Sequence, residues 1–283
     1  MLKFIGLLFL LINFSQIRFA FSIPTESQIT AYQADFLKAF SFTGWYDTSL
    51  SEPEAYESLL ALKATGTEYV VLCFFWFQDN LNSTVIAPDY DLYSVNTSDI
   101  IDFIDYIHSV GLKVVLKPMV DVKTGEWRAL IEPSDEWFQA YKDYMVFWAE
   151  IAEEHDVEMF VLGCEVDGTI TDRDNWIKVI NAVRDVYTGP LTYGANFDRY
   201  DDVSFFDQLD FIGIDAYFPL TDKNNPSLEE LKEGWSRYLP ELEELSLKYN
   251  KDIIFVEVGY RSILGANKEP WNWQKRGIFN EHR

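Results

Sequence analysis

The chain has 283 residues, of which 46 are acidic and 23 are basic, so its formal net charge at pH 7 is −23. A surface this acidic repels nucleic acid and anionic lipid, and neither is expected as a partner. Two cysteines do not make a disulfide framework, and we expect Cys73 and Cys164 to be buried free thiols in strands.

The first 22 residues have the pattern of a secretory signal peptide. Lys3 gives a positive start, residues 4–13 are apolar, and Ala20–Ser22 have the small-x-small pattern of a cleavage site. The apolar stretch is shorter than the roughly 20 residues that a membrane-spanning helix needs, which disfavours an anchor. Cleavage removes two basic residues and no acid, and leaves residues 23–283 as one domain with a net charge of −25. We therefore expect a secreted, extracellular monomer that has no membrane contact after cleavage.

Strand-like and helix-like segments alternate after this leader. The expected strands are residues 40–45, 69–77, 113–122, 158–165, 191–196, 209–218 and 251–260. The expected helices are residues 53–66, 97–111, 135–155, 174–187 and 227–250, with a break in the last one near Pro240. Because the strands are apolar nearly throughout and rich in Val, Ile and Phe, they predict a parallel sheet that is covered on both faces.

This alternation predicts an α/β fold, and we favour a TIM (β/α)8-type barrel over a doubly wound sheet. No G-x-G-x-x-G follows the first strand, so the dinucleotide-binding fingerprint is missing. Only seven strands are recognised, and the 26 residues after Glu257 contain no eighth. The barrel is therefore expected to be incomplete at its C-terminal end.

Polar and aromatic residues gather at the carboxyl ends of the expected strands, which in a barrel meet around one opening where active sites are built. These residues are Trp45, Trp76, Gln78, Lys117, Asp121, Glu165, Asn196, Asp215, Tyr217 and Glu257.

Two glutamates stand out because each follows a buried strand: Glu165 after the fourth and Glu257 at the end of the seventh. Two facing carboxyl groups are what glycoside hydrolysis needs, and a separation of about 5–5.5 Å is typical of retaining enzymes. Tyr217 and Arg261 are candidates to hydrogen-bond Glu257 and keep it ionised, whereas the apolar surroundings of Glu165 favour its neutral form. The alternative is that each glutamate merely ends a strand and caps a neighbouring amide.

The other rim residues allow two interpretations each. Trp45 and Trp76 either stack on sugar rings or pack in the core, and an aromatic content of 17% fits both. Lys117 and Asp121 either contact hydroxyl groups or pair with each other, and Asp215 either binds substrate or orients Lys117. The three histidines form no cluster with ligand spacing, so no metal or other cofactor is expected.

Several stretches resemble glycoside hydrolase family 113, the β-mannanases of a large clan of barrel glycosidases. They are "FSFTGWYD", "FFWFQDN", "LKPMVDVKTGEWRALI", "LTYGANFD", "LDFIGIDAYFPLTD" and "FVEVGYRS", spread over residues 40–262. The resemblance implies a retaining mechanism on β-1,4-linked mannan-type polysaccharides. It matches Glu165 to the acid/base position and Glu257 to the nucleophile position. It also matches Asn196, Asp215 and Tyr217, which we expect to bind substrate, to rim positions in the family's motifs.

Three departures from the family pattern accompany this resemblance. Cys164 precedes the acid/base where many clan members carry Asn, so Asn196 is expected to take over the contact with the sugar 2-hydroxyl. Met119 stands where a histidine is expected, and the eighth strand with its aromatic platform is missing.

We therefore expect a secreted retaining glycoside hydrolase, a glycoprotein if the sequons at Asn82 and Asn96 are used, with a polysaccharide or oligosaccharide as its partner. One alternative is a non-catalytic carbohydrate-binding barrel that holds sugars through Trp45 and Trp76. Another is an incomplete chain that is not stable alone.

Overall fold

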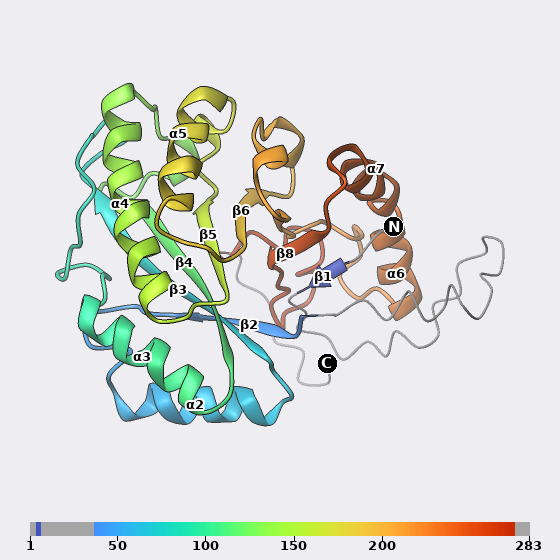
Figure 1. Cartoon of the computed structure of the whole chain (residues 1–283). Helices are drawn as coiled ribbons and strands as arrows, with labels where there is room; N and C mark the ends of the chain where they lie inside the picture. The colour runs from blue at the N-terminus through green and yellow to red at the C-terminus, as the bar shows by residue number, and fades with distance from the viewer. Residues whose placement is uncertain (1–3, 7–36, 275–283) are drawn as a thin grey trace, which may run out of the picture.

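The computed structural model describes residues 4–6 and 37–274, which form a curled parallel sheet with helices between its strands (Figure 1). The strands are β1 (Phe4–Gly6), β2 (Ala39–Thr43), β3 (Tyr69–Gln78), β4 (Lys113–Val122), β5 (Met159–Cys164), β6 (Leu191–Asn196), β7 (Ile212–Asp215) and β8 (Ile253–Glu257). The helices are α2 (Pro53–Ala64), α3 (Thr97–Ser109), α4 (Asp135–Glu154), α5 (Arg173–Arg184), α6 (Leu228–Ser236) and α7 (Leu239–Tyr249).

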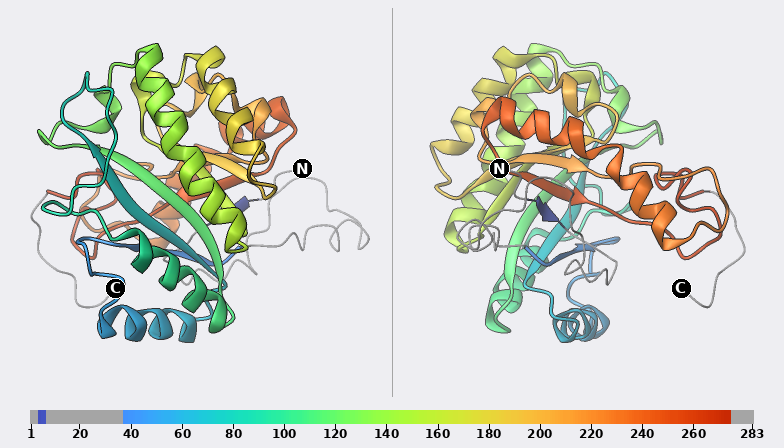
Figure 2. Two further views of the ribbon diagram at one scale, coloured as in Figure 1. Left: turned by 60° about the vertical axis from the view of Figure 1, so that its left-hand side comes forward. Right: turned by 90° about the vertical axis from the view of Figure 1, so that its right-hand side faces the viewer.

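The strand order is β1-β8-β7-β6-β5-β4-β3-β2, and all neighbouring strands are parallel. The seven predicted strands are all present as β2 to β8, which confirms the incomplete barrel. Within the described residues no pairing joins β2 to the other edge of the sheet, so an open seam remains there. The long helices lie on the outer side of the curled sheet (Figure 2).

The strand β1 was not predicted, because it falls inside the expected leader. Its three residues pair with the start of β8, from Phe4 beside Ile253 to Gly6 beside Phe255. The remainder of the leader, and His282 in the C-terminal tail, lie outside the described residues. Leader cleavage stays a prediction.

The two faces of the sheet follow from the alternation of side chains along each strand. In β3, Cys73 and Phe75 belong to the inner cluster, which fills the inside of the curled sheet, whereas Phe74 belongs to the outer core beneath the helices. Trp76 is on this outer side as well, where its ring lies against Tyr144, Phe147 and Trp148 of α4. It therefore packs beneath a helix, and its position does not support the expected stacking on a sugar.

Much of the aromatic content serves the outer core rather than a binding site. The side chains of Trp137, Trp148 and Trp176 are fully buried there. Trp137 stacks on Tyr141 with ring centroids 4.7 Å apart, and Trp176 stacks on Phe205 at 4.5 Å. Such pairs add to the free energy gained by burying apolar area.

The break predicted near Pro240 is confirmed. The helix α6 begins with a capping box formed by Ser227 and Glu230, and it ends at Ser236. The next helix, α7, starts at Leu239, with Pro240 in its first turn, where a missing backbone N–H costs no hydrogen bond. No helix in the described part of the chain is long and apolar enough to cross a membrane. Both cysteines are free and buried, as predicted.

The two tryptophans give a matched test of this packing. Trp76→Ala should lower the free energy of unfolding by about 2–3 kcal/mol, because it leaves a cavity against α4. Trp45→Ala should change it by less than about 1 kcal/mol, because the Trp45 side chain is 59% exposed. Urea unfolding followed by circular dichroism measures both. Equal losses of stability in the two variants would contradict the assignment of Trp76 to the core.

Candidate active site

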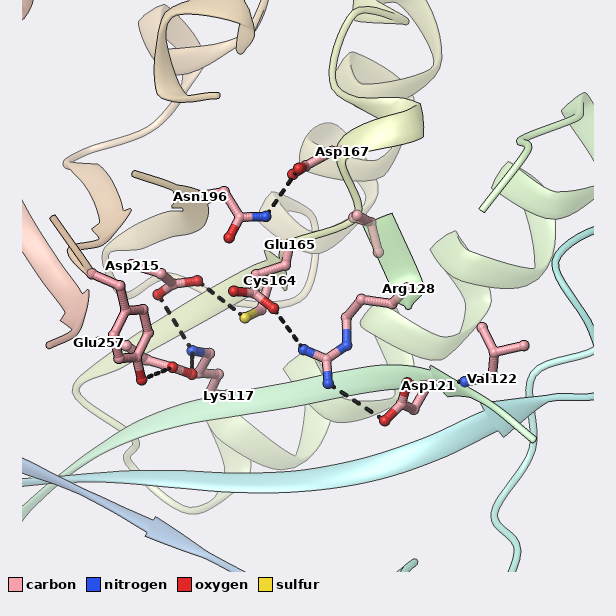
Figure 3. Close-up of polar contacts among 12 residues, drawn as sticks. Lys117, Asp121, Val122, Arg128, Cys164, Glu165, Asp167, Asn196, Asp215 and Glu257 are labelled. Atoms are coloured by element: carbon pink, nitrogen blue, oxygen red, sulfur yellow. Dashed lines mark hydrogen bonds and ion pairs between the residues drawn. The ribbon is translucent and has the colours of Figure 1, made fainter. Parts of the chain in front are cut away.

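Polar side chains from five neighbouring strands meet at the carboxyl end of the sheet (Figure 3). Lys117 comes from β4, Cys164 from β5, Asn196 from β6, Asp215 from β7 and Glu257 from β8. The register places Asn196 beside Asp215 and Asp215 beside Glu257. Because parallel strands run in the same direction, residues that are far apart in sequence form one cluster.

Glu257 is held by two donors. The Lys117 ammonium nitrogen lies 2.5 Å from Oε1, and the Tyr217 hydroxyl donates to Oε2 at 2.7 Å. Burial alone raises the pKa of Glu257, but the charge and hydrogen bond of Lys117 and the hydrogen bond of Tyr217 outweigh it. The pKa of Glu257 therefore lies below its usual value, and the carboxylate stays ionised.

Lys117 itself is completely buried and lies close to a second carboxylate. Its nitrogen is 3.6 Å from Oδ1 of Asp215, and the Cys164 thiol donates to Oδ2 of Asp215 at 3.2 Å. Burial raises the pKa of Asp215 to about 8, and the charges of Glu257 and Glu165 raise it while Lys117 opposes them. This arrangement agrees with the interpretation that Asp215 orients Lys117.

The same cluster has the donor atoms of a small metal site but not the charge for one. Ligand atoms of Cys164, Asp215 and Glu257 all lie within 4.8 Å of one another. The ammonium group of Lys117 already pairs with Glu257, burial raises the pKa of Asp215 to about 8, and burial raises the pKa of the Cys164 thiol well above its usual value. A thiol that keeps its proton is a poor metal ligand.

Glu165 directly follows β5 and has a left-handed backbone, with φ 55°, while its N–H donates to the carbonyl of Gly194 at 3.0 Å. Burial is the largest cause that raises the pKa of Glu165, and the charge of Glu257 raises it further. Arg128 and Lys117 oppose this shift without reversing it. The two glutamates thus have pKa values shifted in opposite directions, which is the division expected for an acid and a nucleophile.

Arg128 was missed by the sequence analysis, although it lies in the quoted stretch "LKPMVDVKTGEWRALI". It follows β4 in a short 3-10 helix (η3, Arg128–Leu130), and its guanidinium donates to Glu165 Oε2 at 3.0 Å and to Asp121 Oδ2 at 3.4 Å. The alternative that Asp121 pairs with Lys117 is therefore wrong: Asp121 pairs with Arg128. The sequence signal that could have identified Arg128 is its position as a charged residue in the loop after a barrel strand.

The predicted hydrogen bond of Arg261 to Glu257 is not made, because Arg261 contacts the C-terminal segment instead. Arg261 is exposed and donates to the backbone carbonyls of Asn272 and Trp273 in the C-terminal segment. Because it lies four residues beyond the end of β8, the direction of its side chain was not fixed by the strand. Tyr217 does make the predicted hydrogen bond to Glu257.

Two other predicted substrate contacts lie at the rim. The exposed ring of Trp45 lies on the inner side, with its centroid 5.9 Å from that of Phe75 and 6.2 Å from that of Tyr93. Asn196 is buried, and its side-chain amide donates to Oδ2 of Asp167 at 2.9 Å. Whether either residue touches a sugar stays a prediction.

The family profile of Glycoside Hydrolase Family 113 matches residues 39–283. Two solved structures of β-1,4-mannanases from that family are 34% and 35% identical to this chain. Each has a TM-score of 0.78 and matches 87% of this chain and 80% of its own.

The β-mannanase AaManA from Alicyclobacillus acidocaldarius, solved in complex with ManMIm, is 29% identical with a TM-score of 0.76. The match covers 85% of this chain and 76% of AaManA. No curated protein matches the chain. Since the family profile covers nearly the whole described domain and the solved members share its fold, the chain belongs to glycoside hydrolase family 113 and is a glycoside hydrolase.

Proposed function

We propose that this protein is a secreted, retaining endo-β-1,4-mannanase that works through Glu165 and Glu257. The observation that carries the proposal is that these two half-buried carboxyl groups lie at the carboxyl ends of β5 and β8, each beside its own cation, with oppositely shifted pKa values. The relatives that are described as β-1,4-mannanases support the choice of substrate. A binding protein without catalysis would have no need to shift the pKa values of two clustered carboxyl groups in opposite directions.

In the first step, ionised Glu257 attacks the anomeric carbon while protonated Glu165 gives its proton to the leaving glycosidic oxygen. The bond from the anomeric carbon to that oxygen breaks, and an ester to Glu257 forms. In the second step, Glu165 takes a proton from water, the water oxygen attacks the same carbon, and the ester bond breaks. Two inversions return the original configuration.

The surroundings suggest how each residue serves these steps. The Lys117 side chain is fully buried and has no surface left to contact a bound sugar. It therefore acts by keeping Glu257 ionised. The exposed ring of Trp45 is suited to stack on a sugar face at the rim. Asn196 and Asp167 are suited to bind a hydroxyl group, since Oδ1 of Asp167 is buried without a protein partner.

Secretion and glycosylation belong to the same proposal and are supported by the sequence. The leader pattern and the two sequons point to a secretory route. Asn82 is exposed in a loop and is the better acceptor for a glycan. Asn96 instead donates its side-chain amide to the carbonyl of Asp47, and a glycan there would compete with that hydrogen bond. The proposed active form is a monomer.

Glu257→Ala should lower kcat on β-mannan at least ~10⁴-fold, because no ester can form. Azide or formate should restore turnover of an activated aryl mannoside and give a product of inverted configuration, since the small anion attacks from the vacated side. Glu54→Ala, an exposed change on α2, is the control. Reducing-sugar assays and NMR of the product measure these effects, and full activity in Glu257→Ala would refute the assignment.

Lys117→Met should move the acid limb of the pH profile. Because Lys117 lowers the pKa of Glu257, its loss raises that pKa, and the nucleophile is then protonated at a higher pH. The acid limb of kcat/KM should shift upward by about one pH unit or more. Lys248→Met, which changes an exposed lysine on α7, should leave the limb in place. An unmoved acid limb in Lys117→Met would show that Lys117 does not set the charge of Glu257.

A further inference from the structure

The guanidinium of Arg128 lies between two carboxylates, and only one of them belongs to the proposed catalytic pair (Figure 3). Nη1 lies 3.0 Å from Oε2 of Glu165, and Nη2 lies 3.4 Å from Oδ2 of Asp121. The side chain is only 14% exposed, so solvent screens these ion pairs weakly. One cation is thus divided between the two acids.

The guanidinium is held in place from several sides. Asp121 projects from β4, and its Oδ2 also accepts a 2.5 Å hydrogen bond from the Tyr93 hydroxyl. The face of Phe75 lies 5.8 Å below the guanidinium carbon. The segment after Arg128 also packs against the segment after Glu165, so closely that a Cβ on Gly168 would collide with the carbonyl oxygen of Ile131. The distance between Arg128 and Glu165 is therefore set by the fold.

An arginine has hydrogen-bond donors only, so the oxygen that it contacts must accept. With Oε2 of Glu165 occupied in this way, an acidic proton on this residue has to be carried by Oε1. At the same time a full positive charge beside Glu165 favours loss of that proton, which a general acid cannot tolerate. Asp121 offsets this charge by taking part of the guanidinium.

We propose that Arg128 and Asp121 act together as positioning residues for Glu165: Arg128 fixes Oε1 as the oxygen that delivers the proton, and Asp121 limits how strongly Arg128 ionises Glu165. This rests on the proposed role of Glu165 as the acid/base. Nothing in the reaction requires Arg128 or Asp121 to touch the sugar.

The other groups that face Glu165 are accounted for. Lys117 lowers the pKa of Glu165 in the same sense as Arg128, and so does Trp127, while the charge of Glu257 raises it. Asp215 interacts with Glu165 as well, but its carboxylate lies beside Lys117. Replacing Asp121 leaves all of these groups in place, whereas replacing Arg128 also removes a charge that lowers the pKa of Glu257. The readouts are therefore the alkaline limb and the Glu165 signal, and not the acid limb.

The two substitutions should act in opposite directions on the alkaline limb of kcat/KM, which reports loss of the proton from Glu165. Arg128→Gln removes a positive charge, raises the pKa of Glu165 and moves the limb upward by about one pH unit. Asp121→Asn leaves Arg128 to Glu165 alone, lowers that pKa and moves the limb downward. Arg128→Lys, which keeps a charge, should return the limb toward that of the unchanged protein. Arg173→Gln, which breaks a surface pair with Asp207, is the control.

A second measurement reads the same ion pair without turnover. Protein labelled with 13C at the glutamate carboxyl groups is titrated by NMR, and Glu165→Gln identifies the Glu165 signal by its loss. Opposite shifts of this pKa in Arg128→Gln and Asp121→Asn support the proposal, and if Arg128→Gln does not fold, the downward shift in Asp121→Asn decides alone. Shifts in the same direction, or none, overturn it. If the unchanged protein cleaves no mannan, the proposed function fails, and the titration still decides whether Arg128 controls Glu165.

Discussion

The site depends on the ion pair between the buried ammonium group of Lys117 and the carboxylate of Glu257. The inner face of the sheet is apolar around it, and a carboxylate buried there alone would take up a proton rather than stay charged. Lys117 lies 2.5 Å from Glu257 and keeps it ionised, and it lies 3.6 Å from Asp215, whose pKa is raised to about 8 by burial. Because the lysine, the acids and their register are all parts of the sheet, the charge of Glu257 is a property of the fold.

A second cation makes the two glutamates different from each other. Glu257 has Lys117 as a close and direct partner, together with the Tyr217 hydroxyl. Glu165 has only a share of Arg128, whose other nitrogen points to Asp121. Unequal access to positive charge is what separates the pKa values of two chemically identical side chains at the same end of the sheet.

The strands and the two glutamates were predictable because strand period and apolar composition are local properties, and strand ends converge in a parallel barrel. The hydrogen bond from Tyr217 followed from the same reasoning. The sequence analysis left Trp76 between sugar stacking and core packing. Its odd spacing from Cys73 and Phe75 puts it on the outer face of the sheet and favours the core. Arg128 and Arg261 lie in loops, where no period fixes direction, so tertiary contacts alone decided which of them reaches a glutamate.

The left-handed backbone of Glu165 shows that the protein loses stability at this position. For a residue with a Cβ, such a conformation costs about 1–2 kcal/mol, whereas glycine adopts it freely. Glycine at position 165 would thus relieve the backbone strain, but it would also remove the carboxyl group. At the turn after β5, stability and catalytic activity therefore oppose each other. Selection for stability alone would favour replacing Glu165, and the resulting protein would lose its proposed acid.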